Sequence, residues 1–229
     1  MKKIIFLILI FCNIYSFTQK KLENIDSKKL NTTRQISIVT PPSYEIDKEK
    51  KFPLIYILDG EYLLDPFNGT LQYVNYFDDL PEVILVGIHQ ANNGERFNDT
   101  YSNDEGLPNE SCKNFYEFLA SEVIPFIDKN YRTLSYKAIA GHDLTAGFLN
   151  FFLYKDSPIF NAYIAICPDF AIDMEYILPK RLNSIKIPVS YFLASSEGDL
   201  DRIFESCNMV NEEVAKLEVS NLSFQYATY

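Results

Sequence analysis

Short apolar runs recur along the chain, and most of them are continuous rather than alternating. They are rich in β-branched and aromatic residues and too short for helices. Continuous runs of this kind are typical of parallel strands covered on both faces. By contrast, apolar and polar positions alternate over residues 34–40, which predicts a half-buried strand. The continuous runs span residues 54–58, 83–88, 138–140, 162–166, 189–193 and 222–226.

Helical patterns lie between these runs, at residues 71–77, 115–130, 146–155, 174–182 and 201–218. Strands that alternate with helices predict a three-layer α/β sandwich with a mostly parallel central sheet. Neither an internal repeat nor a linker divides the pattern. We therefore expect a single domain over residues 34–229, preceded by a polar lead at residues 19–33.

Residues 1–18 have the pattern of a secretory signal peptide. Lys2 and Lys3 form a positive start, residues 4–11 are an apolar run too short to span a bilayer, and residues 16–18 offer small side chains for cleavage. We expect an exported protein, periplasmic or secreted, with no transmembrane segment after cleavage. A lipoprotein signal through Cys12 and a buried N-terminal helix are the alternatives.

Composition and charge exclude several classes of protein. The 229 residues are 47% hydrophobic and 15% aromatic, which suffices for a full core. There are 21 Lys and Arg against 31 Asp and Glu, a formal charge of −10, so we expect no nucleic-acid partner. The four cysteines form neither a CxxC motif nor a Cys/His cluster, so we expect no metal site. With no phosphate loop or dinucleotide fingerprint, we expect no cofactor.

A polar stretch at residues 90–111 is longer than most loops of compact domains. It follows the run at residues 83–88, and ligands of open α/β sheets bind beyond the carboxyl ends of the strands. The stretch is therefore a candidate functional loop. A surface insertion without a role fits the sequence equally well.

The run at residues 138–140 leads through a tight turn into a helix, with small residues at Ala140, Gly141, Ala146 and Gly147. Small residues around such a turn are typical of a nucleophile elbow, in which the central side chain stands on a strained backbone above the sheet. The residue at the centre of this turn is Asp143.

Together with other segments, this turn resembles the putative-esterase family of the α/β-hydrolase fold, which includes esterase D and enterochelin-esterase-like proteins. The resemblance covers most of the chain after about residue 34, and it implies an α/β-hydrolase fold, hydrolysis of carboxylic esters and a small-molecule substrate or ligand. The matched segments are Pro-Pro-Ser-Tyr at 41–44, residues 53–60 with their Leu-Asp-Gly ending, Ile-Pro-Phe-Ile-Asp-Lys-Asn-Tyr-Arg at 124–132, Gly141-His142, and Phe-Asn-Ala-Tyr at 160–163.

Two residues depart from the family pattern. Asp143 stands where the family esterases have serine, and Thr145 stands where they have glycine. A carboxylate that attacks an ester would give an anhydride in place of a stable acyl-serine. Members of the wider fold that use aspartate, the haloalkane dehalogenases and epoxide hydrolases, displace at saturated carbon and then need a histidine to activate water. Asp143 is therefore admissible as a nucleophile only with a base.

The chain has two histidines, His89 and His142. His142 precedes the elbow residue, and neighbours in a tight turn point apart, so we expect it to pack or hydrogen-bond locally. His89 ends a strand beside the polar stretch and could line the pocket. The resemblance places the catalytic histidine after the final strand. The sequence given ends at Tyr229, within that strand, so either it or the protein lacks the final histidine loop and helix.

The resemblance also assigns the acid and the oxyanion hole. The acid would follow the next-to-last run, where we prefer Asp199 over Glu197 by position; solvated loop acids near a helix start are the alternative. The oxyanion hole would use the backbone N–H groups of Leu144 and of the turn at Gly60 and Glu61. Backbone donors survive changes of side chain, so such a pocket can persist without activity.

Two functions remain open. The chain is either an exported esterase-like hydrolase, with altered chemistry through Asp143 and an unconventional base such as His89, or a catalytically inactive member of the fold that binds a ligand or partner. A third interpretation is a remnant whose last strand lacks its covering helix. The sequence favours the family label of esterase-like hydrolase and does not reveal the substrate.

Overall fold

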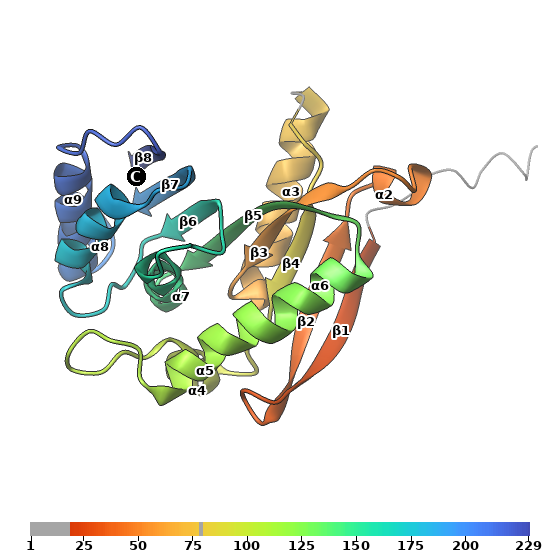
Figure 1. The fold of residues 1–229 in the computed structure, drawn as a ribbon, viewed down its shortest axis with the longest axis horizontal. Coiled ribbons are helices and arrows are strands. Elements are labelled where there is room, and N and C mark those ends of the chain that lie inside the picture. Colours follow the sequence, from red (N-terminus) through yellow and green to blue (C-terminus); the bar gives the residue numbers. More distant parts are fainter. Residues whose placement is uncertain (1–18, 78–79) are drawn as a thin grey trace, which may run out of the picture.

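An eight-stranded sheet forms the centre of the structure, a computed structural model that describes residues 19–77 and 80–229 (Figure 1). The predicted signal peptide lies outside the described residues. The strand order is β1-β2-β4-β3-β5-β6-β7-β8. β2 pairs antiparallel with β1 and β4, and the other neighbours are parallel. The strands are β1 (Gln19–Ser27), β2 (Thr32–Thr40), β3 (Phe52–Ile57), β4 (Ile84–Ile88), β5 (Thr133–His142), β6 (Ala162–Ile166), β7 (Val189–Ser195) and β8 (Leu222–Thr228).

Helices cover both faces of this sheet, which confirms the predicted three-layer sandwich. α3 (Gly60–Phe77) packs on one face, against a small apolar cluster around Leu64. The other long helices bury their apolar residues in a larger cluster on the opposite face. The remaining helical segments are α2 (Ser43–Ile46), α4 (Asn93–Thr100), α5 (Glu110–Phe118), a π-helical turn (Leu119–Val123), α6 (Ile124–Asn130), α7 (Leu144–Phe148), a 3-10 segment (Leu149–Tyr154), α8 (Met174–Ser184) and α9 (Asp201–Val214).

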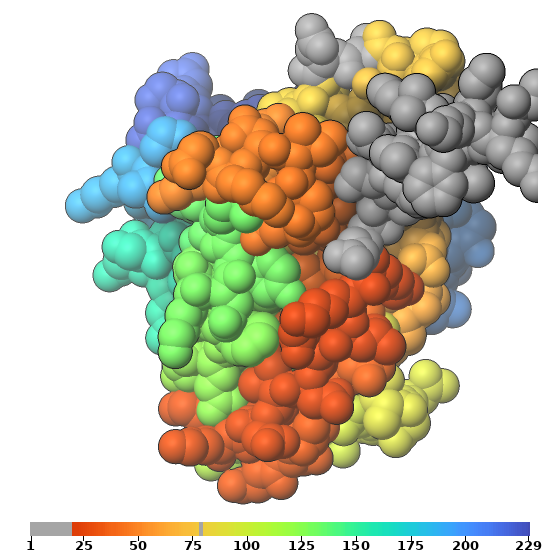
Figure 2. Space-filling view, turned by 90° about the vertical axis from the view of Figure 1, so that its right-hand side faces the viewer, coloured from red at the N-terminus to blue at the C-terminus, as the bar shows by residue number. Residues whose placement is uncertain are grey.

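The polar lead at residues 19–33 belongs to the sheet. β1 pairs with β2 along its whole length, from Gln19 opposite Thr40 to Ser27 opposite Thr32. The red strand lies beside the green helices in Figure 2. At this contact, Ser27 Oγ donates a hydrogen bond of 2.6 Å to Glu122. An edge strand is rich in charged residues and lacks a continuous apolar run, so the pattern did not reveal it.

α3 begins eleven residues before the predicted helix because glycines let it lie against β4. A Cβ on Gly60 would approach the backbone of Gly87 to 2.7 Å, so a side chain there would push the helix off the sheet. The middle of α3 contains Pro66 and Gly69, which are poor helix formers, and tertiary packing overrides their propensity.

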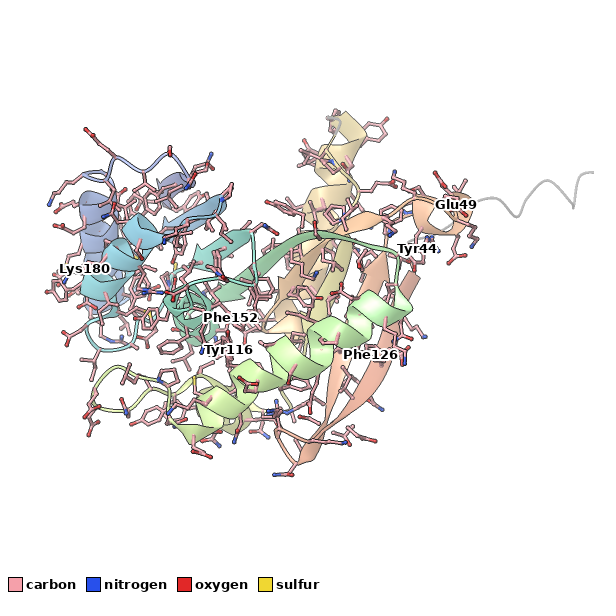
Figure 3. The ribbon with its side chains drawn as sticks, viewed as in Figure 1. Tyr44, Glu49, Tyr116, Phe126, Phe152 and Lys180 are labelled. Carbon is pink, nitrogen blue, oxygen red and sulfur yellow. The ribbon has the colours of Figure 1, made fainter. Side chains whose placement is uncertain are left out.

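An aromatic cluster holds the segment after the elbow against α5. Tyr116 of α5 stacks on Phe152 with ring centroids 4.3 Å apart, and the two residues lie beside each other in Figure 3. Phe148 of α7 contacts Phe115 of α5 with centroids 5.1 Å apart, and Phe152 contacts Phe160 at 4.9 Å. These ring contacts fix α7, and with it the turn that precedes it, relative to the helical layer.

Within residues 19–77 and 80–229, no helix is both long and apolar enough to cross a bilayer. The same part of the chain contains no group of three or more His, Cys, Asp or Glu residues that could hold a metal ion. The free cysteines described are Cys112, Cys167 and Cys207.

Candidate functional site

Asp143 occupies the turn between β5 and α7, with φ 56° and ψ −119°. A positive φ is unfavourable for a residue with a side chain, and here the surrounding hydrogen bonds maintain it. The Asp143 N–H donates to the carbonyl of Ile166 over 3.0 Å, and its carbonyl accepts from Gly147 and Asp169. The chain therefore has the backbone of a nucleophile elbow with aspartate at its centre.

The small residues of the elbow are sterically necessary. A Cβ on Gly141 would lie 2.8 Å from Thr145 Oγ1 and 2.9 Å from the Thr145 backbone. A Cβ on Gly147 would lie 1.9 Å from the carbonyl oxygen of Asp169. Gly141 thus lets the chain reverse tightly, and Gly147 lets α7 lie against the loop that follows β6.

Arg96 of α4 connects the elbow carboxylate to a second, buried carboxylate. Its Nη1 donates to Asp143 Oδ2 over 3.1 Å, and its Nη2 donates to the carbonyl of His142 over 2.8 Å. Its Nε and Nη2 bind the two oxygens of Asp59 at 2.7 and 3.1 Å. The Asp143 side chain is 35% exposed, whereas that of Asp59 is fully buried. The buried Asp59 therefore orients the Arg96 guanidinium through Nε and Nη2, and Nη1 is left to bind Asp143.

Asp59 is fully hydrogen-bonded, as a buried carboxylate must be. Besides the two bonds from Arg96, its Oδ2 accepts from Thr145 Oγ1 at 2.6 Å and from the Tyr62 hydroxyl at 2.9 Å. Thr145 thus supplies a donor to the carboxylate that orients Arg96. Asp59 itself has φ 55°, a second strained position beside the elbow.

The electrostatics of this cluster keep Arg96 charged. Burial lowers the pKa of Arg96, but the hydrogen bonds and charge of Asp59, together with the bond to Asp143, hold that pKa well above its usual value. Burial, followed by the charge of Asp59, raises the pKa of the Tyr62 hydroxyl. Tyr62 therefore stays protonated and donates to Asp59.

The polar stretch at residues 90–111 folds into α4 and the start of α5, and α4 places Arg96 beside Asp143. A buried ion pair fixes α4 to β2: Arg34 binds both oxygens of Asp99 at 2.9 Å, and its Nη1 lies 3.0 Å from Glu95. Asn92 caps the helix by accepting from the Glu95 N–H over 2.9 Å. The spacing of Asn92 and Glu95 is a helix-start signal in the sequence, and it could have revealed α4.

The two histidines bond to groups other than the Asp143 carboxylate. His89 Nε2 lies 2.7 Å from Ser37 Oγ of β2, and burial lowers the pKa of its ring. His142 Nδ1 lies 3.2 Å from the Tyr62 hydroxyl, and the His142 ring is perpendicular to the Tyr62 ring. In this arrangement neither imidazole is positioned beside Asp143 to activate a water.

Asp199 and Glu197 follow β7 at the same edge of the sheet as the elbow. The Asp199 carboxylate accepts from the Leu200 N–H at 2.7 Å and from the thiol of Cys167. Burial, the hydrogen bond to Asp199 and the charges of Asp199 and Asp143 raise the pKa of Cys167 to about 11. The thiol that both carboxylates influence is thus protonated and unreactive. Glu197 is exposed, and its N–H donates to the Tyr229 carbonyl over 3.0 Å.

The predicted oxyanion donors begin two helices. The N–H of Leu144 is the first of α7, and helix geometry leaves such a group without an intrahelical acceptor. Gly60 and Glu61 begin α3. Desolvation raises the pKa of Glu61, while hydrogen bonds from its own N–H and from that of Gln90 oppose the rise. The Glu61 carboxylate therefore lies close to this backbone donor.

A cavity of about 170 Å³ lies beside the elbow, between α4 and α7. One wall is formed by Phe97 of α4 and by Tyr101, which directly follows this helix. The centroids of these two rings are 4.8 Å apart. Leu144 and Phe148 of α7 form another wall, and Thr100, Ser102 and Asp169 are the polar residues of the lining. Aromatic walls with a few polar groups are typical of a site for a small organic molecule.

A mostly parallel sheet with a tight strand-to-helix turn at the carboxyl end of a central strand is the arrangement of the α/β-hydrolase fold. The model of the family described as "Putative esterase" matches residues 27–154, more than half of the chain, and the chain belongs to this family. This confirms the resemblance. No curated protein matches the chain.

Solved structures share the fold. An uncharacterised protein from Capnocytophaga ochracea superposes with TM-score 0.83 at 20% identity, over 92% of this chain and 58% of that protein. An IroE-like serine hydrolase from Shewanella oneidensis superposes with TM-score 0.79 at 23% sequence identity, over 92% of this chain and 73% of that protein. The BES protein from Bacillus cereus superposes with TM-score 0.76 at 21% sequence identity, over 91% of this chain and 87% of that protein. The chain therefore spans less than two thirds of the first of these proteins.

Proposed function

We propose that this chain is an exported member of the esterase family that binds a small ligand at the elbow and does not cleave esters there. The observation that carries the proposal is the ion pair between Arg96 and Asp143. Arg96 is itself held by two bonds to the buried Asp59, so the partner of Asp143 is fixed in place. The elbow thus carries a neutralised, oriented carboxylate in place of a free nucleophile.

Two physical arguments support the loss of ester cleavage. To attack, Asp143 would have to give up its charge-assisted bond from Arg96, and the product with an ester would be a reactive anhydride. An ester carbonyl under attack also develops negative charge, which a family esterase stabilises with backbone donors. Here that charge would develop beside Asp143 Oδ1, an electron-rich carboxylate oxygen that accepts no hydrogen bond from Arg96, and near the carboxylate of Glu61.

The cavity beside the elbow suits a small, partly aromatic or apolar ligand. Its volume of about 170 Å³ is below the ~300–1,000 Å³ of drug-sized sites, so only a compact molecule or one end of a longer molecule fits. Export follows from the signal-peptide pattern at residues 1–18, and the acidic charge of −10 argues against nucleic acid as the partner.

A hydrolase that displaces at saturated carbon is the second candidate. One observation favours it: Asp143 keeps the elbow backbone, its side chain is 35% exposed, and within the described residues no donor reaches its Oδ1. That oxygen could attack an alkyl halide or an epoxide. The resulting alkyl ester would still need a base, and His89 is engaged with Ser37.

Turnover assays separate the two candidates. We expect the protein to hydrolyse aryl acetates, alkyl bromides and aryl epoxides no faster than its Asp143→Asn variant does. Titration calorimetry with the same aryl acetates measures binding, which we expect Phe97→Ala to weaken and Tyr136→Ala to leave unchanged. These two residues are similarly exposed, at 47% and 46%, but only Phe97 lines the cavity. Turnover that disappears in Asp143→Asn would exclude the binding-only function.

A further inference from the structure

A second cavity lies at the far end of α3 from the elbow. It has a volume of about 490 Å³ and is bounded by the second half of α3, the end of β2 and the start of β4. α3 begins at the carboxyl end of β3 and runs back along the sheet, so its C-terminal half lies at the opposite edge from Asp143. Figure 1 shows this end of the helix projecting beyond the sheet. The cavity is therefore separate from the elbow site.

Exposed aromatic rings gather at this end of α3. Tyr73, Tyr76 and Phe77 are 68%, 83% and 65% exposed. Phe77 contacts Tyr73 with ring centroids 5.1 Å apart and Tyr76 at 4.9 Å. Tyr76 also lines the cavity. Large rings that cluster on a surface while remaining exposed indicate a binding surface, because isolated exposed rings are the rule elsewhere.

The polar part of the lining is neutral. Asn68, Gln72 and Asn75 follow one another at helical spacings of four and three, so their amides form one stripe that faces the cavity. Gln72 Nε2 donates to Asn68 Oδ1 over 3.1 Å, which orients two of the amides along the stripe. Amides offer both donors and acceptors without charge.

The single ionised group among the described lining residues is Glu82, and it is already paired. Its carboxylate binds Lys50 Nζ at 2.6 Å and the hydroxyl of Ser43. The cavity floor is apolar, with Val39, Leu71 and Leu85. A lining of this kind offers no free charge to an anion or a cation. A purely apolar ligand would desolvate the Asn75 amide without offering it a hydrogen bond.

We propose that this cavity, which we call the α3 groove, binds a neutral saccharide chain. A sugar ring has hydroxyls for the amide stripe and an apolar C–H face that can lie on an exposed aromatic ring. The α3 groove presents both kinds of surface side by side, with Tyr76 next to Asn75 and the amide stripe beyond. A volume of about 490 Å³ falls within the ~300–1,000 Å³ of small-ligand sites, so a short stretch of a longer chain fits.

Affinity electrophoresis of the full chain tests this directly. Native gels contain soluble xylan, mixed-linkage β-glucan or amylopectin, and a gel without polysaccharide serves as the reference. We expect at least one of the three polymers to retard the protein, and we expect free oligosaccharide of that polymer to reverse the retardation. Because the ligand and lining are neutral, added salt should not weaken the binding.

Matched variants locate the site. Tyr76→Ala should weaken the binding by about tenfold through loss of ring contact, while Tyr176→Ala should leave it unchanged. Tyr176 is a half-exposed tyrosine on α8, outside the α3 groove. Asn75→Leu removes one amide of the stripe and should weaken binding without unfolding, because Asn75 is exposed.

Three results would overturn the proposal. No retardation by any of the three polymers would do so, as would equal retardation of the wild-type protein and Tyr76→Ala. The third is concentration-dependent dimerisation in sedimentation that Tyr76→Ala abolishes, which would identify the aromatic rings as a contact between copies of this chain. Asp143→Asn should bind like the wild type, so failure here says nothing about the elbow, and failure of the elbow proposal leaves this one intact.

Discussion

Thr145 Oγ1 donates a hydrogen bond of 2.6 Å to Oδ2 of the buried Asp59. Thr145 and Asp143 are the two elbow residues interpreted from the sequence as departures from the family pattern, and Asp59 lies between them in the hydrogen-bond network. It accepts from Thr145 on one side and orients Arg96 on the other, and Arg96 binds Asp143. The two departures therefore belong to one hydrogen-bond network and are expected to act together.

Thr145→Val tests this network, because it keeps the shape of the side chain and removes its hydroxyl. A lost hydrogen bond to a buried charge should cost about 1.5–3 kcal/mol of the free energy of unfolding. Thr145→Ser retains the hydroxyl and should cost under ~1 kcal/mol. Urea denaturation of the two variants measures the difference; equal stabilities would show that the bond to Asp59 contributes nothing.

Arg96→Gln should destabilise the fold strongly. It leaves the Asp59 carboxylate, which has no exposed side-chain surface, without its cation, and such a loss costs about 3–5 kcal/mol. Arg202→Gln is the matched control, since Arg202 also pairs with one aspartate, Asp169, but is 61% exposed. That change should cost at most ~1 kcal/mol. Thermal unfolding that ranks the two variants in the opposite order would contradict the structural role of Arg96.

The elbow and α3 provide a pair of glycines with opposite expectations. Gly147→Ala should destabilise by at least ~2 kcal/mol, because its Cβ would overlap the Asp169 carbonyl oxygen at 1.9 Å. Gly69→Ala should stabilise by about 0.5–1 kcal/mol, since nothing lies within 4 Å of its Cβ and alanine favours the helix. Chemical denaturation of both variants decides the matter, and a tolerated Gly147→Ala would show that α7 does not lie so close to this loop.

His89 should make stability depend on pH. Burial lowers the pKa of its ring below the ordinary 6.5, so between the folded pKa and 6.5 the unfolded chain binds more protons than the folded protein. Its contribution to stability is therefore present above 6.5 and decreases as the pH falls through the folded pKa. We expect the stability difference between the wild type and His89→Gln to shrink from about pH 7 to about pH 5. A difference that stays constant or grows would contradict a ring held neutral beside Ser37.

Periodicity predicted the layers because they depend on burial, but it could not predict the network. The continuous apolar runs correspond to β3 to β8, and glycine spacing predicted the elbow at Asp143. Edge strand β1 was not predicted because it is rich in charged and polar residues and lacks an apolar run. Asp59 and Arg96 are 37 residues apart, and no local pattern pairs them. Only the path of α4, fixed by Arg34 and Asp99, brings them together.

The central claim is that Asp143 does not act as a nucleophile. An attack followed by hydrolysis at the carboxylate carbon would leave one oxygen from water in the Asp143 side chain. The protein is therefore incubated with aryl acetates, alkyl bromides and aryl epoxides in water enriched in heavy oxygen, and the peptide containing Asp143 is weighed by mass spectrometry. We predict the same peptide mass as in a sample without substrate. A substrate-dependent gain of one heavy oxygen, located at Asp143, would contradict the account.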